Sequence, residues 1–217
     1  MSGQVKVQIE DVRKHRDLYR QRRKRSAIPV IAIVGYTNAG KSTLFNSLSQ
    51  ADVLVEDKVF ATLDPTTRRI KLADNEVVLL TDTVGFIRKL PPTIVSAFRA
   101  TLEELAEASL LLHVVDISSP YSLQQSKVVE ETLVDLNLAE KPRITILNKV
   151  DLLLPSGEVL DENKAIEYLS NPEVAGPPAD NTILVSAVKK WGFKRLVSAI
   201  SEILKQSEKA SVFIPQK

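Results

Sequence analysis

Cysteine is absent from all 217 residues, which excludes a disulfide framework and a thiolate metal site and is typical of a reducing compartment. Long hydrophobic runs are absent too, since residues 28–34 and 109–115 fall far short of the roughly 20 residues of a membrane-spanning helix. The first residues show no apolar run behind a basic cluster, so no secretory signal is expected. We therefore predict a cytoplasmic protein, with peripheral contact to a membrane as the alternative.

The net charge is also small, at +2, but the charges are unevenly placed. Residues 1–25 contain nine Lys or Arg and three Asp or Glu, which leaves 20 basic and 24 acidic residues for the rest of the chain. A basic arm on a mildly acidic body favours a polyanionic partner such as nucleic acid. A solvated helix explains the same charges equally well, so both interpretations stay open at this point.

Short apolar runs alternate with longer amphipathic stretches after Pro29. The apolar runs predict strands that are buried on both faces, at residues 31–34, 77–80, 110–115, 144–148 and 182–186. Helices are expected over residues 41–49, 93–108, 122–137, 161–169 and 193–207, and a further strand over 69–72. This alternation predicts an α/β domain with a mostly parallel twisted sheet and helices on both faces. His113, within an apolar run, is expected to be a core residue rather than a ligand.

A charged segment at about residues 5–25, free of Gly and Pro, predicts an additional N-terminal helix. Its apolar positions are too sparse for a helix that packs on the domain core. We expect this helix to project from the domain or to pack against something outside the chain.

Residues 35–42, GYTNAGKS, carry the most specific chemistry, because they follow an apolar strand and open an amphipathic helix. Such a loop turns its backbone N–H groups inward around phosphates, and the helix that follows contributes its positive N-terminal end. The Lys41 ammonium would bridge the β- and γ-phosphates, and the Ser42 hydroxyl would ligate Mg²⁺. The motif predicts a nucleoside triphosphate site without naming the base.

A second motif, DTVG, follows the apolar run at residues 77–80. At the end of a strand, the Asp82 carboxylate can hold Mg²⁺ through water, and the Gly85 amide can meet a γ-phosphate. Asp-x-x-Gly alone is a common turn, so its position after a predicted strand is what makes it informative.

The base is indicated by NKVD at residues 148–151, at the end of another predicted strand. Guanine presents two adjacent N–H donors that the Asp151 carboxylate can accept together, whereas adenine offers neither. An ATP-using kinase is therefore disfavoured. Asn148 would tie this loop to the phosphate loop, and the Lys149 stem would cover one face of the ring. A weaker motif, SAV at residues 186–188, could donate a backbone N–H to the guanine carbonyl.

The long segment at residues 51–68 has no clean period, and such loops are usually functional. A threonine there is expected to complete the Mg²⁺ shell when the γ-phosphate is present. Thr62, Thr66 and Thr67 compete for that role, and we choose Thr62 because the other two lie close to a predicted strand, where β-propensity explains them.

These motifs, together with FATLDPTTRR at residues 60–69 and DTVGFIRKLP at residues 82–91, resemble the G domain of the HflX family of ribosome-associated GTPases over roughly residues 20–204. The resemblance implies a P-loop NTPase fold, GTP hydrolysis with Mg²⁺, and binding to the large (50S) ribosomal subunit and its RNA, with splitting or rescue of stalled ribosomes as the outcome. The segment FATLD is also similar to FTTL in the related Obg family, which places Thr62 on the Mg²⁺-binding threonine.

HflX proteins carry an N-terminal domain that is joined to the G domain by a helical arm rich in Arg and Lys, and residues 14–25 are similar to the end of that arm. We therefore expect residues 1–26 to be this arm, residues 27–208 to be the GTP-binding G domain and residues 209–217 to be a C-terminal tail. A monomer is expected. The competing interpretation is an RNA- or membrane-associated binding module in which hydrolysis only times dissociation.

Phe86 lies where Ras-like GTPases place the glutamine that orients the attacking water. Because phenylalanine cannot hold water by hydrogen bonding, we predict slow intrinsic hydrolysis that needs an outside catalytic group or loop ordering by the partner. The alternative is that Phe86 only packs against the core.

The predicted catalytic residues are Lys41, Thr62 and Gly85, and the predicted metal ligands are Ser42 and Thr62, with Asp82 acting through water. The predicted GTP-binding residues are Gly35, Tyr36, Thr37, Asn38, Ala39, Gly40, Lys41, Ser42, Thr43, Phe60, Ala61, Thr62, Leu63, Asp64, Asp82, Thr83, Val84, Gly85, Asn148, Lys149, Val150, Asp151, Ser186, Ala187 and Val188.

Overall fold

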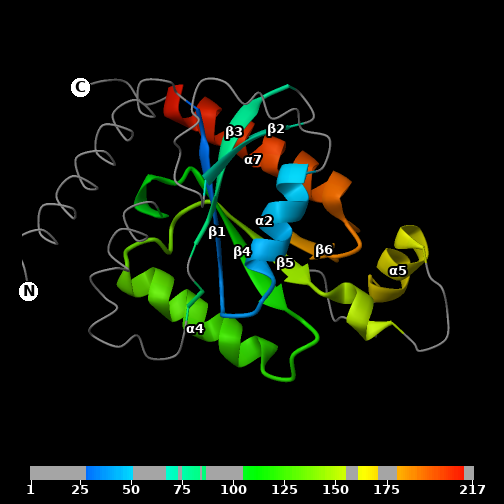
Figure 1. The fold of residues 1–217 in the computed structure, drawn as a ribbon. Coiled ribbons are helices and arrows are strands. Elements are labelled where there is room, and N and C mark those ends of the chain that lie inside the picture. Colours follow the sequence, from blue (N-terminus) through cyan, green and yellow to red (C-terminus); the bar gives the residue numbers. More distant parts are fainter. Residues whose placement is uncertain are drawn as a thin grey trace, which may run out of the picture.

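Six strands form one sheet in the order β2-β3-β1-β4-β5-β6 (Figure 1). The computed structural model describes residues 28–50, 67–72, 75–83, 85–86, 105–154, 161–170 and 180–212. The elements are β1 (Val30–Gly35), α2 (Lys41–Gln50), β2 (Thr67–Lys71), β3 (Val77–Asp82), β4 (Leu110–Asp116), α4 (Ser122–Asp135), β5 (Arg143–Asn148), the 3₁₀ helix η1 (Val150–Leu153), α5 (Glu162–Leu169), β6 (Thr182–Val185) and α7 (Phe193–Val212).

The sheet is parallel except at one edge, where β2 pairs antiparallel with β3. This confirms the predicted mostly parallel α/β fold. After β1 the chain adds β2 and β3 on one side of it, and β4, β5 and β6 follow on the other side. The carboxyl ends of β1, β3, β4 and β5 therefore meet at one edge of the sheet, where open α/β sheets bind their ligands.

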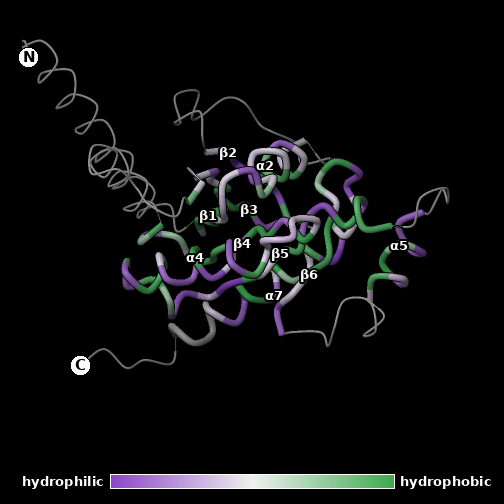
Figure 2. The backbone as a smooth tube through the Cα atoms, turned by 90° about the horizontal axis from the view of Figure 1, so that it is seen from below, coloured by the Kyte–Doolittle hydropathy of each residue, from purple (hydrophilic) through white to green (hydrophobic). Residues whose placement is uncertain are grey.

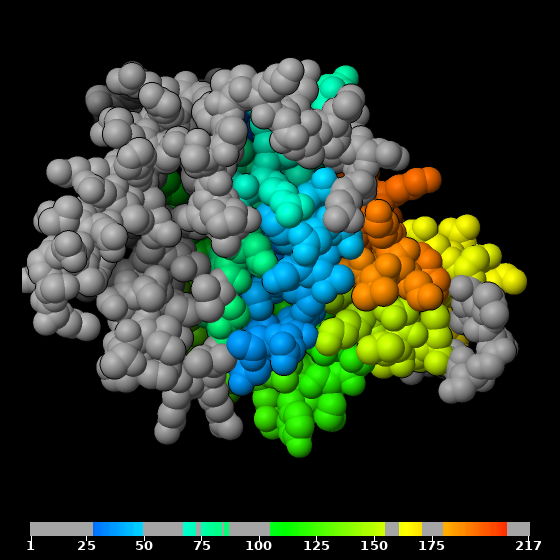
Figure 3. Space-filling view, viewed as in Figure 1, coloured from blue at the N-terminus to red at the C-terminus, as the bar shows by residue number. Residues whose placement is uncertain are grey.

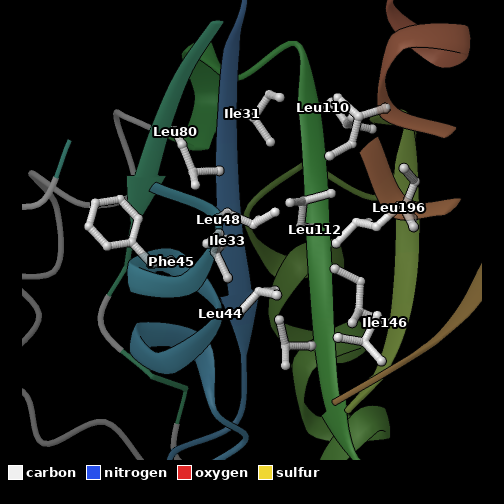
Figure 4. Packing of buried hydrophobic residues seen from close by; sticks show 14 of the residues in the cluster. Ile31, Ile33, Leu44, Phe45, Leu48, Leu80, Leu110, Leu112, Ile146 and Leu196 are labelled. Atoms are coloured by element: carbon white, nitrogen blue, oxygen red, sulfur yellow. The ribbon is translucent and has the colours of Figure 1, made fainter. Parts of the chain in front are cut away.

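Helices cover both faces of the sheet. The first face carries α2 and α7, whose Leu44, Leu48 and Leu196 pack against inward side chains of β1 and β4 (Figure 4). The opposite face carries α4, which buries Val129 and Leu133 against the other side of the same strands. Because both faces are covered, β1 is buried along its whole length, and the hydrophobic segments gather along the strands (Figure 2). Burial on both faces explains why the strands read as continuous apolar runs in the sequence.

Several predicted boundaries shift. The helix expected at residues 193–207 continues to Val212. The helix expected at 122–137 ends at Asp135, since Asn137 adopts a left-handed backbone. Of the helix expected at 93–108, the described part is helical at residues 105–107 and no longer at Ala108.

The predicted N-terminal arm at residues 1–26 and helix at 5–25 lie outside the described residues. The same holds for residues 213–217 of the predicted tail. Within the described part of the chain, no helix is both long and apolar enough to cross a membrane.

His113 is a core residue, as predicted, and only 1% of it is exposed. It lies on β4 with its Nδ1 atom 3.4 Å from Oε1 of Glu130 on α4, and the other oxygen of Glu130 accepts a hydrogen bond from Arg143 Nη1 at 2.8 Å. Burial, and then the charge of Arg143, lowers the pKa of His113 to about 4. The imidazole is therefore neutral near pH 7.

Folding is expected to weaken between pH 7 and pH 5 because of this histidine. In the unfolded chain a histidine has a pKa near 6.5, so below that pH the unfolded state binds a proton, whereas the folded state binds one only below about pH 4. The stabilisation of the folded state by neutral His113 is therefore complete above pH 6.5, decreases as the pH drops and no longer changes below pH 4. We expect His113→Leu, which stays apolar and buried, to remove about 2 kcal/mol of the wild-type pH dependence, measured by urea unfolding at both pH values. Identical pH slopes in the two proteins would contradict this assignment.

Candidate functional site

The predicted phosphate loop lies at the carboxyl end of β1 and is fixed on one side by the segment after β3. The Phe86 N–H donates to the Gly35 carbonyl and the Thr37 N–H donates to the Phe86 carbonyl, each at 3.0 Å. Lys41, at the start of α2, folds back across the loop, and its Nζ donates to the Tyr36 carbonyl at 2.8 Å. Lys41 is buried as a residue, and its ammonium is held by the loop through Tyr36.

The start of α2 presents unused N–H groups. Among the described residues, none accepts a hydrogen bond from the backbone N–H groups of residues 40–43. Ser42 and Thr43 are exposed, so a ligand can approach this turn from solvent. Backbone donors at a helix N-terminus, with a cation beside them, form a site for a phosphate group.

Three observations test whether Mg²⁺ and phosphates fit here. Burial lowers the pKa of Lys41 and the negative charge of Asp82 opposes that effect, so the two side chains interact electrostatically. Oδ1 of Asp82 is buried, and no described residue forms a hydrogen bond with it. A Cβ atom on Gly85 would lie 2.8 Å from Lys41 Nζ, so a side chain there would fill the space at the ammonium. The residues present fit a bound phosphate and a hydrated cation next to Asp82.

Asn148, the first residue of the NKVD motif, joins three separate segments. Its Nδ2 donates to the Ala39 carbonyl in the phosphate loop at 2.9 Å, and its Oδ1 accepts a hydrogen bond from the Ala187 N–H at 3.1 Å. The side chain is buried, with 2% exposed. The predicted link from this motif to the phosphate loop is therefore present, together with a link to the SAV segment that the sequence did not reveal.

The other residues of the motif take up distinct positions. Lys149 adopts a left-handed backbone with φ of 66°, and η1 begins directly after it. Val150 is buried, whereas Asp151 is partly exposed in the first turn of η1. Among the described residues, none donates a hydrogen bond to the Asp151 carboxylate or pairs with it. Its oxygens are available for a ligand with two adjacent donors.

The SAV segment forms a closed turn after β6. Ser186 and Trp191 exchange two backbone hydrogen bonds at 3.2 Å, and the Lys189 N–H donates to Ser186 Oγ at 3.1 Å. The N–H groups of Ser186 and Ala187 are thus already used, by Trp191 and Asn148 respectively. Val188 is 72% exposed at the tip of the turn.

These segments come together in space. Figure 3 shows the phosphate loop and α2 (blue) next to the chain after β4 (green) and beside the segment after β5 (yellow-green). The predicted residues Phe60, Ala61, Thr62, Leu63, Asp64 and Val84, as well as Thr66, lie outside the described residues. Thr83 is buried and its hydroxyl donates to the Ile33 carbonyl.

Thr67, one of the three threonines considered for Mg²⁺, belongs to β2. It is buried, and its Oγ1 lies 3.1 Å from Oγ1 of Thr81 on β3. Both hydroxyl groups are therefore paired within the sheet. This agrees with setting Thr67 aside, whereas Thr62 stays a prediction.

Phe86 packs into the core with 1% exposed, in the cluster that contains Val34, Leu105 and Leu111. Its side chain contributes to that core, against which Tyr36 of the phosphate loop also packs. The packing role considered for Phe86 is therefore the observed one, and it leaves no side chain from this position to orient water.

A strand, phosphate loop and helix, followed by Asp82, NKVD and SAV segments at one sheet edge, define the class of P-loop GTP-binding domains. The family model described as "50S ribosome-binding GTPase" matches residues 30–149. The chain belongs to this family of GTPases. The predicted resemblance to HflX is also confirmed, because the curated relatives are proteins named GTPase HflX.

GTPase HflX of Caldanaerobacter subterraneus subsp. tengcongensis is 50% identical over 214 residues, which cover 97% of this chain and 45% of that protein. GTPase HflX of Escherichia coli K12 is 46% identical over 201 residues, which cover 93% of this chain and 44% of that protein. The chain thus spans less than half the length of these relatives. A GTP-binding protein of Sulfolobus solfataricus, solved in complex with GDP, is 30% identical with a TM-score of 0.59 over 89% of this chain and 58% of that one.

Proposed function

We propose that this chain is the part of an HflX-like protein that binds and hydrolyses GTP, and that it acts on the large ribosomal subunit. The observation that carries the first half is the position of Asn148, which holds the phosphate loop and the SAV turn against the NKVD motif. Asn148 thereby sets the distance between the proposed phosphate site at the phosphate loop and the proposed purine site at the NKVD motif.

In this proposal the triphosphate lies on the N–H groups at the start of α2, with the Lys41 ammonium between its β- and γ-phosphates. Ser42 and Thr62 would ligate Mg²⁺, and Asp82 would hold it through water. Bound Mg²⁺ supplies neutralisation of the charge that develops on the phosphates. The Gly85 N–H would donate to the γ-phosphate, and Asp151 would accept from the two donors of guanine.

Asp151→Ala tests the base assignment. Losing two charge-assisted hydrogen bonds, each roughly 1.5–3 kcal/mol, is expected to weaken GTP binding by about 100-fold or more and to leave ATP binding nearly unchanged. Calorimetric titration of both nucleotides measures the two affinities. Asp135→Ala, at an exposed site at the end of α4, is the control and should bind GTP like the wild type. The proposal fails if the wild type takes up no guanine nucleotide, or if Asp151→Ala keeps the preference for GTP.

The ribosomal half of the proposal is supported by the family's description and by the HflX relatives. The burial of Phe86 adds a physical reason, because a site that lacks a water-orienting side chain at this position gains most from a partner that completes it. GTP hydrolysis with and without purified large ribosomal subunits tests this half.

A further inference from the structure

The carboxylate of Asp116, at the carboxyl end of β4, receives three hydrogen bonds from its surroundings. Lys149 Nζ lies 2.7 Å from Oδ2, while the N–H and Oγ of Ser118 donate to Oδ1 at 3.0 and 2.6 Å. Only 14% of the Asp116 side chain is exposed. Burial alone would raise the pKa of Asp116, but the hydrogen bonds from Lys149 and Ser118 and the charge of Lys149 outweigh it and lower the pKa. The pair is therefore ionic at neutral pH.

The ion pair determines where the Lys149 side chain lies. Lys149 adopts a left-handed backbone next to Asn148, and Asp116 is the register partner of Asn148 in the sheet. The Lys149 Cε atom lies 4.0 Å from the position that a Cβ on Gly40 would occupy, so the stem passes directly beside the phosphate loop. A free lysine side chain has about 2 kcal/mol of rotamer entropy, and the ion pair with Asp116 restricts this freedom without a ligand.

We propose that Asp116 is a positioning residue for the nucleotide: by anchoring the Lys149 ammonium, it holds the lysine stem as a fixed apolar surface on which the purine ring packs. This inference rests on the proposed function and adds a residue to it. Asp116 acts through Lys149 and not on the base itself, so it sets affinity for guanine nucleotides without choosing the base. Pre-arranged contacts of this kind raise affinity because the ligand does not have to order them.

Asp116→Asn tests the proposal, because it keeps the shape and an acceptor for Ser118 and removes the charge that anchors Lys149. We expect about tenfold weaker binding of fluorescent GDP and of fluorescent GTP, with faster dissociation of both. The ratio of GDP to ADP affinity should stay at the wild-type value, which a general distortion of the site would change. Unaltered affinity and dissociation rates in this variant would overturn the proposal.

A double-mutant cycle separates positioning from a merely structural role. Lys149→Met keeps an apolar stem without the ammonium, so adding Asp116→Asn to it should cause no further loss of affinity. Equal losses in both backgrounds would show that Asp116 does not act through Lys149. Glu130→Gln is the matched control, since it breaks a similar ion pair, with Arg143 at 2.8 Å, away from Lys149. It should leave nucleotide affinity unchanged.

Nucleotide binding by the wild type distinguishes failure of the proposed function from failure of the role proposed for Asp116. If the wild type bound no guanine nucleotide, the proposed function would fail, and the role of Asp116 would fail with it. If the wild type bound guanine nucleotide and Asp116→Asn bound it equally well, only the role of Asp116 would fail.

Discussion

Gly40→Ala is expected to weaken the binding of both GTP and GDP by about 1,000-fold. The φ angle of Gly40 is 97°, and an alanine Cβ there would lie 2.2 Å from Nδ2 of Asn148. A side chain in this backbone conformation is strained by roughly 1–3 kcal/mol, and displacing Asn148 breaks two buried hydrogen bonds of about 1–3 kcal/mol each. Together these effects amount to roughly 4 kcal/mol or more, and each 1.4 kcal/mol is a tenfold change in affinity.

The loss should appear in binding more than in folding. The empty loop can relax toward solvent on its exposed side at Thr37 and Asn38, whereas bound phosphate needs all the N–H groups to point inward. Calorimetric titration gives the affinity, and urea unfolding without nucleotide gives the stability.

Asn148→Ala provides the control for the cause. If the clash with Asn148 is the main effect, Gly40→Ala should add only the backbone strain in an Asn148→Ala background. A full 1,000-fold additional loss there would place the cause elsewhere in the loop, and near-wild-type binding by Gly40→Ala alone would contradict the prediction outright.

Much of the fold could be predicted because its strands are buried on both faces. His113 is the one polar residue among the buried residues of β1 and β4. Both strands therefore read as continuous apolar runs that differ clearly from the neighbouring sequence. β2 was harder to place, because only Thr67 and Ile70 of its five residues are buried, while Arg68 is exposed and Arg69 and Lys71 are partly exposed. This mixed pattern is expected for a strand at the edge of the sheet. It begins at Thr67, two residues before the predicted start.

Side-chain contacts between distant segments were beyond the reach of sequence patterns. The motifs revealed Asn148 and Lys41, because their chemistry follows from fixed spacing. Asp116 carries no motif of its own, and the ion pair with Lys149 joins residues 33 positions apart. The one available signal was a carboxylate at the carboxyl end of an apolar run, a position that in a parallel sheet lies beside the other strand ends. The hydrogen bond from Ala187 to Asn148 depends on the register of β5 and β6 and likewise leaves no trace in sequence.

Large ribosomal subunits are expected to raise the rate of GTP hydrolysis by about 10³- to 10⁵-fold, the range in which an outside group completes an incomplete GTPase site. The reason lies in Phe86. Its backbone is held on both sides by hydrogen bonds with Gly35 and Thr37, and its ring is buried in the α4-side core. Turning the ring toward the γ-phosphate would therefore take it out of this core, while the backbone of Phe86 stays bonded to the phosphate loop.

The same geometry predicts that Phe86→Gln does not create a fast intrinsic GTPase. A glutamine at this position would replace a ring with 1% exposed, and its unpaired amide would weaken folding by roughly 1–3 kcal/mol instead of reaching a water molecule. Single-turnover hydrolysis by the wild type and by Phe86→Gln, each with and without large subunits, measures both effects. Rapid turnover by the purified wild-type chain without ribosomes would show that the site is already complete. Since this chain covers less than half of its HflX relatives, the same assay on a longer chain that matches their full length distinguishes a need for further segments from an absent ribosomal role.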